Sequence, residues 1–190
     1  MLKLNLGSCD NLLGDYTNVD RFDFSRLGFD FQVVDLNRRW PWEDSSVDAI
    51  RANDIFEHLW PTFSLQGDNQ GFQVRRTDVP AKAWVMNEAH RVLRPGGTLD
   101  IIVPTTDGRG AWQDPTHVTF WTPNDFFYYC EHWEEWKRFR RAYRITAQFR
   151  VRGAIPGFDG RDKAWSVITE GHAAVANQVT KLYVPLEAIK

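Results

Sequence analysis

The chain has 190 residues with 23 basic and 25 acidic side chains, which gives a net charge of -2 at pH 7. A chain of this length can bury a core as one domain, and its balanced charge argues against a protein built around nucleic-acid phosphates. Cys9 and Cys130 are too few for a disulfide framework and lack metal-ligand spacing. No apolar run approaches the ~20 residues that span a bilayer, and the N-terminus reads as a charged strand rather than a signal peptide, so we expect a cytoplasmic protein.

Short apolar runs bounded by turn residues predict the buried parallel strands of an α/β sheet. These runs are residues 2–6, 17–20, 31–35, 47–52 and 98–103. Between the last two runs, apolar side chains recur at helical spacing over residues 80–93, where Pro80 suits the first turn and Pro95-Gly96-Gly97 cannot continue the helix. The sequence contains no repeat and no linker, so we expect a single domain over residues 1–190.

The first two predicted strands end in residues that are typical of a nucleotide-cofactor site. Gly7 follows the first strand, where a glycine lets the backbone approach a ligand closely, and Asp20 closes the second, where a carboxylate can accept hydrogen bonds from ribose hydroxyls. A dinucleotide fingerprint would need Gly-x-Gly-x-x-Gly and an acid about 20 residues further on. Ser8-Cys9-Asp10 follows Gly7 instead, so the pattern does not predict a pyrophosphate cradle.

Six segments, taken in order, resemble a class I S-adenosylmethionine-dependent methyltransferase of the methyltransferase type 11 kind. The resemblance covers residues 2 to about 104 and continues more loosely to Lys190. The segments are Leu4-Asn5-Leu6-Gly7, Asn18-Val19-Asp20, Asp35-Leu36, the Pro-x-x-Asp-x-Ser-x-Asp run of residues 41–48, Phe56-Glu57-His58-Leu59, and the run of residues 88–97 that ends in Arg-Val-Leu-Arg-Pro-Gly-Gly. That ending is the most specific part, because in the family it closes the helix before the fifth strand.

The resemblance implies a Rossmann-like sheet of seven mostly parallel strands, with helices on both faces and an antiparallel C-terminal hairpin. Residues 143–152 alternate apolar and polar side chains, which predicts a half-exposed strand that residues 179–186 can pair with. The chain from Ser8 to Thr17 is too short for a full crossover helix between parallel strands. We therefore expect the first crossover helix to be shortened or absent.

The implied cofactor is S-adenosylmethionine, bound at the carboxyl ends of the strands, where open α/β sheets bind their ligands. Turn formation is an alternative role for Asp20 and Asp35, and the alternative for His58 is a polar residue that only satisfies a strand-helix junction. The residues that the resemblance implies as cofactor contacts are Gly7 and Ser8 in the turn under the cofactor, Asp20 at the ribose, Asp35 and Leu36 beside the adenine, and Asn53, Asp54 and His58 after the fourth strand.

Methyl transfer needs an acceptor aligned with the methyl group and, for a hydroxyl or amine, a group that removes a proton. Asp114-Pro115-Thr116-His117 follows the fifth strand, and family members with this motif carry it over the active site. We expect His117 to be the general base, oriented by Asp114 or Glu57. The alternative is a histidine packed in a loop, with Asp114-Pro115 making a turn. Imidazole and carboxylate groups suit divalent metals, but their spacing here predicts no metal site.

Aromatic residues are concentrated between Trp112 and Phe139. Thr122, Pro123 and Asp125 predict a helix start within this stretch, so most of the rings belong to the core, while a few can line a pocket for a sugar or aromatic acceptor. We expect lid insertions at residues 61–79 and 105–137. The aromatic residues are Trp112, Phe120, Trp121, Phe126, Phe127, Tyr128, Tyr129, Trp133, Trp136 and Phe139.

The sequence thus favours methyl transfer from S-adenosylmethionine to an oxygen or nitrogen of a small-molecule acceptor. Two alternatives stay open. A degenerate domain of this fold could serve as an interaction module, and the basic face of residues 137–152 could bind or modify nucleic acid. Glutamates beside that face favour a solvated surface instead. The basic residues are Lys137, Arg138, Arg140, Arg141, Arg144, Arg150 and Arg152.

Overall fold

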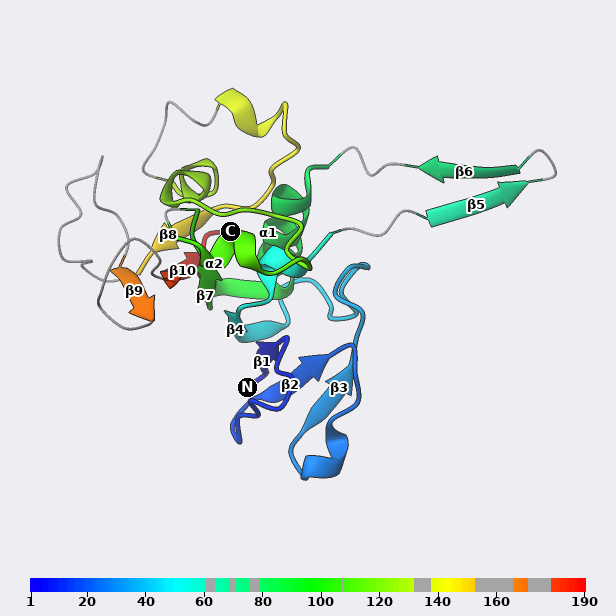
Figure 1. Cartoon of the computed structure of the whole chain (residues 1–190), viewed down its shortest axis with the longest axis vertical. Helices are drawn as coiled ribbons and strands as arrows, with labels where there is room; N and C mark the ends of the chain where they lie inside the picture. Colours follow the sequence, from blue (N-terminus) through cyan, green and yellow to red (C-terminus); the bar gives the residue numbers. More distant parts are fainter. Residues whose placement is uncertain are drawn as a thin grey trace.

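The computed structural model describes residues 1–60, 64–68, 71–75, 79–106, 108–131, 138–152, 166–170 and 179–190. Its main element is a mixed sheet in which seven strands follow the order β3-β2-β1-β4-β7-β10-β8, and β9 also pairs with β10 (Figure 1). This order confirms the predicted Rossmann-like sheet. The strands are β1 (Lys3–Leu6), β2 (Thr17–Asp20), β3 (Phe31–Val33), β4 (Val47–Asn53), β7 (Leu93–Pro104), β8 (Phe149–Val151), β9 (Ser166–Glu170) and β10 (Val179–Ala188).

The direction of the strands creates one edge at which a ligand can bind. Strands β1, β2, β3, β4 and β7 run parallel, whereas β10 runs antiparallel to β7, β8 and β9. The sheet order reverses at β1, because β2 lies on one side of it and β4 on the other. Leu6 pairs with Val19 of β2 and with Ala52 of β4, so the carboxyl ends of the three strands meet at this switch point.

Two buried asparagines take the place of a helix between β1 and β2. Residues 7–16 contain no helix, which confirms that the first crossover helix is absent. The Asn5 amide donates to Asn18 Oδ1 and to the carbonyl of Asn11, both at 2.9 Å. Asn18 Oδ1 also accepts from the Leu13 N–H at 2.9 Å, and its amide donates to the carbonyls of Leu13 and Asp30. These bonds fix the short loop between β1 and β2.

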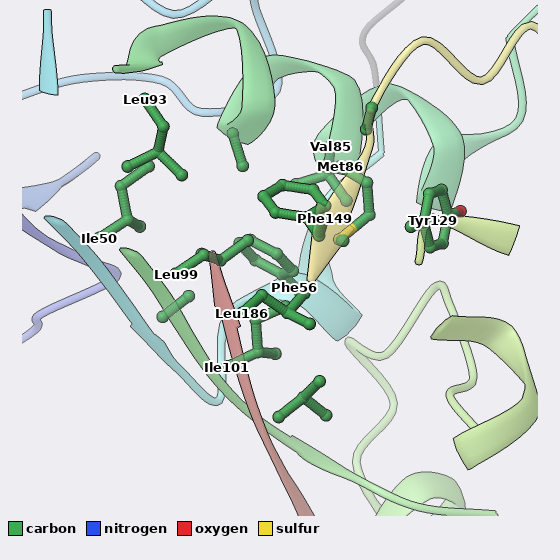
Figure 2. Packing of buried hydrophobic residues seen from close by; sticks show 14 of the residues in the cluster. Ile50, Phe56, Val85, Met86, Leu93, Leu99, Ile101, Tyr129, Phe149 and Leu186 are labelled. Atoms are coloured by element: carbon green, nitrogen blue, oxygen red, sulfur yellow. The ribbon is translucent and has the colours of Figure 1, made fainter. Parts of the chain in front are cut away.

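The long helix packs its apolar side against the sheet. Helix α1 (Ala81–Val92) begins after Pro80, as predicted, and leads directly into β7. Figure 2 shows Val85 and Met86 on the side of α1 that faces Phe149 and Phe56. Burying each of these side chains contributes roughly 1.5–3 kcal/mol, so the layer holds α1 in place. No helix in the described part of the chain is long and apolar enough to cross a membrane.

The Glu88–Arg91 pair of α1 holds the loop that precedes β4. The Arg91 guanidinium donates to the carbonyls of Trp40 and Trp42, each at 2.9 Å, and forms ion pairs of 2.8 Å with Glu88 and Asp44. Glu88 also accepts the N–H of Trp40 at 2.8 Å. Glu88 and Arg91, which belong to the run of residues 88–97, therefore have a structural role, because they fix the buried Trp40 ring against the helix.

The predicted strand over residues 143–152 is wrong in its first half. Only Phe149–Val151 forms strand β8, which pairs antiparallel with β10 as expected. Residues before it are bound by α1 instead: Asn87 Oδ1 accepts the N–H groups of Thr146 and Ala147, and the Asn87 amide donates to the carbonyl of Arg144. Because these backbone groups pair with a helix side chain, they are not available to a neighbouring strand.

Two strand boundaries also differ from the prediction. Strand β3 ends at Val33 rather than at residue 35. Strand β7 begins at Leu93, before Pro95-Gly96-Gly97, and its pairing with β4 moves from Val47 opposite Leu93 to Ala49 opposite Thr98. The glycine segment is therefore an irregularity within β7 rather than a turn that precedes it.

The two predicted lid insertions contain local structure. Within 61–79, β5 (Ser64–Asp68) and β6 (Gly71–Arg75) form a separate antiparallel sheet, and residues 61–63, 69–70 and 76–78 lie outside the described residues (Figure 1). Within 105–137 lie α2 (Gly110–Gln113) and the 3₁₀ helix η3 (Pro123–Tyr128), with Thr122 and Asp125 forming the expected capping box. Residues 107 and 132–137 are outside the described residues. Lid function and the single-domain organisation stay predictions.

Replacing Asn18 tests whether its side chain stabilises the short crossover. We expect Asn18→Ala to lower the free energy of unfolding by about 3 kcal/mol, because it leaves the Asn5 amide and the Leu13 N–H without their acceptor in a buried site. At about 2–4 °C per kcal/mol for a chain of this size, the melting temperature should fall by about 6–12 °C. Asn11→Ala is the matched control, since that side chain is exposed. Equal melting temperatures for the two variants would contradict this role.

Candidate active site

The turn after β1 depends on a glycine. Gly7 has a φ of +64°, and a Cβ built on it would lie 2.6 Å from the Cβ of Ile55. Ile55 follows β4, so the two strand ends that flank the switch point are in direct contact at this position. Any larger residue at position 7 would push these ends apart.

Asp20 joins the end of β2 to the turn after β1. Its Oδ2 accepts the N–H of Cys9 and its Oδ1 accepts the N–H of Phe22, both at 3.0 Å. Each oxygen keeps a second lone pair for a ligand. Cys9 has a φ of 46°, a left-handed conformation that costs a non-glycine residue free energy and that is often found at functional sites.

Ser8 offers a buried hydroxyl at the same turn. The residue is 3% exposed, and its Oγ has no hydrogen-bond partner within the described residues. A buried hydroxyl without a partner is unfavourable unless a ligand supplies one. With Gly7 and Asp20, it makes the turn suitable for an adenosine-bearing cofactor.

The residues after β3 are arranged differently from the two preceding strand ends. Asp35 is exposed, and it accepts the N–H of Asn37 at 3.1 Å and the Nε of Arg38 at 3.2 Å. The first of these bonds is the pattern of a turn-forming aspartate. Leu36 is 4% exposed and belongs to the core cluster. Both alternatives for Asp35, cofactor contact and turn formation, are thus compatible with its position.

The residues after β4 bring a cation to the same edge. Asn53 is the last residue of β4, and Asp54 follows with a φ of 51°. The Asp54 carboxylate pairs with Lys181 Nζ of β10 at 2.7 Å. This ion pair links the parallel part of the sheet to its antiparallel part. No local sequence pattern indicates Lys181, which lies far from Asp54 in the chain.

Glu57 is a buried carboxyl group next to these strand ends. It lies in the 3₁₀ helix η2 (Phe56–His58), is 1% exposed, and neither side-chain oxygen has a hydrogen-bond partner within the described residues. Burial raises the pKa of Glu57 to about 8, since a charged carboxylate loses its hydration there. The Glu57 carbonyl accepts the N–H groups of Val118 and Thr119 at 2.9 and 3.0 Å, which brings the loop after α2 onto η2.

Two histidines face the Glu57 carboxyl group. Nε2 of His58 and Nε2 of His117 each lie 4.0 Å from Glu57 Oε1, and the two rings are 4.7 Å apart between centroids. Asp114 Oδ2 is 3.9 Å from His117 Nε2. The fold therefore brings together the three predicted catalytic residues, Glu57, Asp114 and His117, and adds His58 to them. Their roles in catalysis stay predictions.

Hydrogen bonds set the orientation of both imidazole rings. His117 Nδ1 lies 3.0 Å from the carbonyl of Ala111, which can only accept, so Nδ1 carries the proton. His58 Nδ1 lies 3.0 Å from Thr116 Oγ1, whose own proton is donated to Asp114 Oδ1 at 2.6 Å. His58 Nδ1 is therefore a donor as well. Burial and the neighbouring His117 lower the pKa of His58, which favours its neutral form.

A cavity of about 600 Å³ lies beside this group. It shares Val118 and Thr119 with the loop that binds the Glu57 carbonyl, and aromatic rings make up much of its wall. Some rings of the aromatic-rich stretch therefore line a pocket, while Trp121 and Phe126 are fully buried in the core, as expected. The aromatic lining residues are Trp60, Phe120, Tyr128, Tyr129 and Tyr143.

The basic face of residues 137–152 is partly neutralised within the chain. Arg150 pairs with Glu131 at 2.6 Å, Arg152 pairs with Asp100, and the Arg140 guanidinium donates to the carbonyl of Ala147. Lys137 lies outside the described residues. These contacts agree with a solvated surface more than with a face reserved for phosphates.

The unpaired Glu57 carboxyl group makes a testable contribution to stability. The folded state keeps the Glu57 proton up to about pH 8, whereas the unfolded state releases it near 4.5. The folded state binds more protons in that window, so stability should fall by on the order of 3 kcal/mol as pH rises from 4.5 to 8. We expect Glu57→Gln to remove this part of the slope in thermal melts with a chelator present. Exposed Glu43 provides the control variant, Glu43→Gln; parallel pH curves for wild type and Glu57→Gln would contradict the assignment.

The sequence matches no protein-family model and none of the curated proteins with which it was compared. Solved structures do match. The 1,6-didemethyltoxoflavin-N1-methyltransferase of Burkholderia thailandensis, with bound 1,6-didemethyltoxoflavin and S-adenosylhomocysteine, matches with a TM-score of 0.55 and 12% identity over 100% of this chain and 71% of that chain.

A SAM-dependent methyltransferase from Methanosarcina mazei matches with a TM-score of 0.55 and 12% identity over 98% of this chain and 92% of that chain. The [4+2]-cyclase SpnF matches with a TM-score of 0.51 and 12% identity over 98% of this chain and 75% of that chain. At such low identity the likeness concerns the fold and not the activity. Together with the strand order and the full coverage of the chain, these matches show that the protein has the fold of the class I S-adenosylmethionine-dependent methyltransferases.

Proposed function

We propose that the protein transfers a methyl group from S-adenosylmethionine to an oxygen or nitrogen of a small-molecule acceptor. The observation that carries the proposal is the convergence of Gly7, Ser8 and Asp20 at the switch point of the sheet, where Asp20 binds the turn after β1. Ligands of open α/β sheets bind at such a point. The methyltransferase of Burkholderia thailandensis has S-adenosylhomocysteine and a small molecule bound, which supports the same classes of cofactor and acceptor here.

The residues at the switch point suit an adenosine-bearing cofactor. We assign the ribose hydroxyls to the remaining lone pairs of Asp20, and a polar group of the cofactor to the buried Ser8 hydroxyl, which has no partner within the described chain. The other proposed contacts lie around this centre. They are Gly7 under the cofactor, Asp35 and Leu36 near the adenine, Asn53 at the end of β4, and Asp54 and His58 after it.

The chemistry then requires an aligned acceptor and a proton acceptor. The sulfonium of the cofactor makes its methyl group electrophilic, so the protein mainly positions the acceptor and removes its proton. We assign proton removal to His117, because its Nδ1–H is fixed by the Ala111 carbonyl and its Nε2 therefore carries a lone pair. Asp114 Oδ2, at 3.9 Å from Nε2, would stabilise the protonated ring, and Glu57 Oε1, at 4.0 Å, would add to this only above about pH 8, where its carboxyl group is ionised.

The adjacent cavity suits a flat acceptor. Its aromatic wall favours the face of a sugar or an aromatic ring, and the Lys82–Asp125 ion pair at 2.6 Å offers polar groups at its rim. A volume of about 600 Å³ is in the range of pockets for small metabolites. We therefore propose a sugar or aromatic metabolite as the acceptor class.

Binding of the cofactor product is the direct test. We expect S-adenosylhomocysteine, but not NAD, to bind in isothermal titration calorimetry and to raise the melting temperature by several degrees at 100 times its dissociation constant. Asp20→Asn should weaken that binding at least tenfold, since one charged acceptor for the ribose hydroxyls is lost, which costs about 1.5–3 kcal/mol.

Asp10→Asn is the control, because Asp10 is exposed in the same loop. Its dissociation constant should equal that of the wild type. The same fold occurs in the [4+2]-cyclase SpnF, so cofactor binding alone does not establish methyl transfer. Absence of binding in the folded wild type would reject the proposal and support the interaction-module alternative.

A further inference from the structure

The Glu57, His58 and His117 side chains form a cluster with the composition of a metal site. One ligand atom from each residue lies within 4.8 Å of the other two, and both Nε2 atoms are 4.0 Å from Glu57 Oε1. The residues come from η2 after β4 and from the loop after α2, so two separate parts of the chain converge on one point. Sequence spacing gave no indication of this grouping.

The state of Glu57 is an independent indication of a ligand. The side chain is 2% exposed, and neither of its oxygens has a hydrogen-bond partner among the residues that the structure describes. A buried carboxyl group without a partner is unfavourable, and a cation bound to it removes that cost. Lys181, whose charge acts on Glu57, is already paired with Asp54 at 2.7 Å.

Both histidines present the atom that a metal needs. Nδ1 donates to the Ala111 carbonyl in His117 and to the Thr116 hydroxyl in His58, so each neutral ring carries its lone pair on Nε2, 4.0 Å from Glu57 Oε1. Metal-binding histidines usually donate their other N–H to a carbonyl, a carboxylate or a similar acceptor, which fixes the tautomer. Asp114 completes this arrangement, since it accepts the Thr116 hydroxyl proton at 2.6 Å.

We propose that Glu57, His58 and His117 bind one divalent transition-metal ion through a carboxylate oxygen and two imidazole Nε2 atoms. Zinc, cobalt, nickel or iron suits this ligand set, whereas magnesium and calcium prefer oxygen ligands. Zinc bonds of about 2.0–2.2 Å place tetrahedral ligand atoms roughly 3.3 Å apart. The side chains therefore need to close by roughly 1 Å, which small side-chain rotations can supply. Three protein ligands leave at least one position open for water or another ligand.

The proposal does not depend on methyl transfer, but it changes the role of His117. A bound ion occupies the Nε2 lone pair, so in the loaded protein His117 is a ligand and not the general base. A metal ion lowers the pKa of a hydroxyl that binds at its open position, and the proton passes to solvent. This second step rests on the proposed function, whereas metal binding does not.

Metal binding is measured directly on the full chain. Protein stripped with a chelator is dialysed against Zn²⁺ or Co²⁺ and analysed by inductively coupled plasma mass spectrometry. We expect one ion per chain, Co²⁺ ligand-field absorption of a four- or five-coordinate site, and binding of Zn²⁺ at least 100-fold tighter than that of Mg²⁺. A metal content below one tenth per chain, or equal affinities for Zn²⁺ and Mg²⁺, would overturn the proposal.

Variants separate a metal site from a purely structural cluster. Glu57→Gln and His117→Gln should each weaken Zn²⁺ binding by at least 100-fold. Thr116→Val should weaken it by no more than roughly 10-fold, because it removes the hydroxyl acceptor of His58 Nδ1 and leaves the Thr116 carbonyl at 3.3 Å. His90→Gln is the matched control, since His90 is a partly buried histidine whose Nε2 contacts the Ile189 carbonyl away from the cluster. It should bind Zn²⁺ like the wild type.

The metal-free Glu57→Gln variant is first checked for a cooperative thermal transition, so its loss of metal cannot be attributed to unfolding. Equal losses in Glu57→Gln and His90→Gln would contradict the site. S-adenosylhomocysteine affinity, measured on the same samples, reports on the proposed function separately. A protein that binds the cofactor product but no metal rejects only the metal site, and the reverse result rejects only methyl transfer.

Discussion

The arrangement of the candidate site depends on hydrogen bonds made by Asn18. Parallel strands normally need a crossover helix, whose packed face fixes their relative position. Here β1 and β2 are joined by a loop, and the Asn18 side chain, which is fully buried, binds Asn5 on β1 and the backbone of the loop. The Asn18 N–H also donates to the Asp30 carbonyl before β3. One amide group thus sets the register of three strands, and with it the distance between Gly7 and Asp20.

A second constraint acts on the other side of the switch point. The Glu57 carbonyl binds the N–H groups of Val118 and Thr119, which positions His117 next to η2. The backbone of Glu57 therefore stabilises the loop, while its unpaired side chain opposes folding as soon as it is ionised. Such a conflict is expected where a side chain is retained for its chemistry rather than for packing. The left-handed residues Cys9 and Asp54 lie at the same edge and point to the same conclusion.

The sequence predicts the parts of the fold that depend on local patterns. The apolar runs of β1, β2, β4 and β7 and the helix that starts after Pro80 are visible because their burial or their period is regular. The strand predicted over residues 143–152 fails, because alternation cannot reveal that Asn87 of α1 binds the backbone of Thr146 and Ala147. Lys181 could not be assigned to Asp54 for a similar reason, since the two are 127 positions apart.

The difference between local patterns and contacts of distant residues also explains which parts of the site could be predicted. Gly7 after β1 and Asp20 at the end of β2 belong to a local motif, so the sequence reveals them. The Glu57, His58 and His117 cluster forms only because the loop after α2 returns to η2, which no local motif reveals. The asparagines in β1 and β2, Asn5 and Asn18, were a signal for the buried network at Asn18, because a polar side chain at a core position requires partners. The sequence alone shows them only as members of the segments that resemble the methyltransferases.

The fold limits the location of the chemistry more than its nature. The methyltransferases and the [4+2]-cyclase SpnF that match this chain have one fold in common, so a switch point between β1 and β4 does not define a reaction. What distinguishes this chain is the chemistry of a few groups at that edge. These groups are the buried Glu57 carboxyl group and the imidazole rings of His58 and His117. The aromatic cavity is next to them, since Val118 and Thr119 line it. Because both imidazole rings are fixed by bonds to the backbone or to a neighbouring hydroxyl, they can hold a reacting group in one orientation without rearranging the sheet.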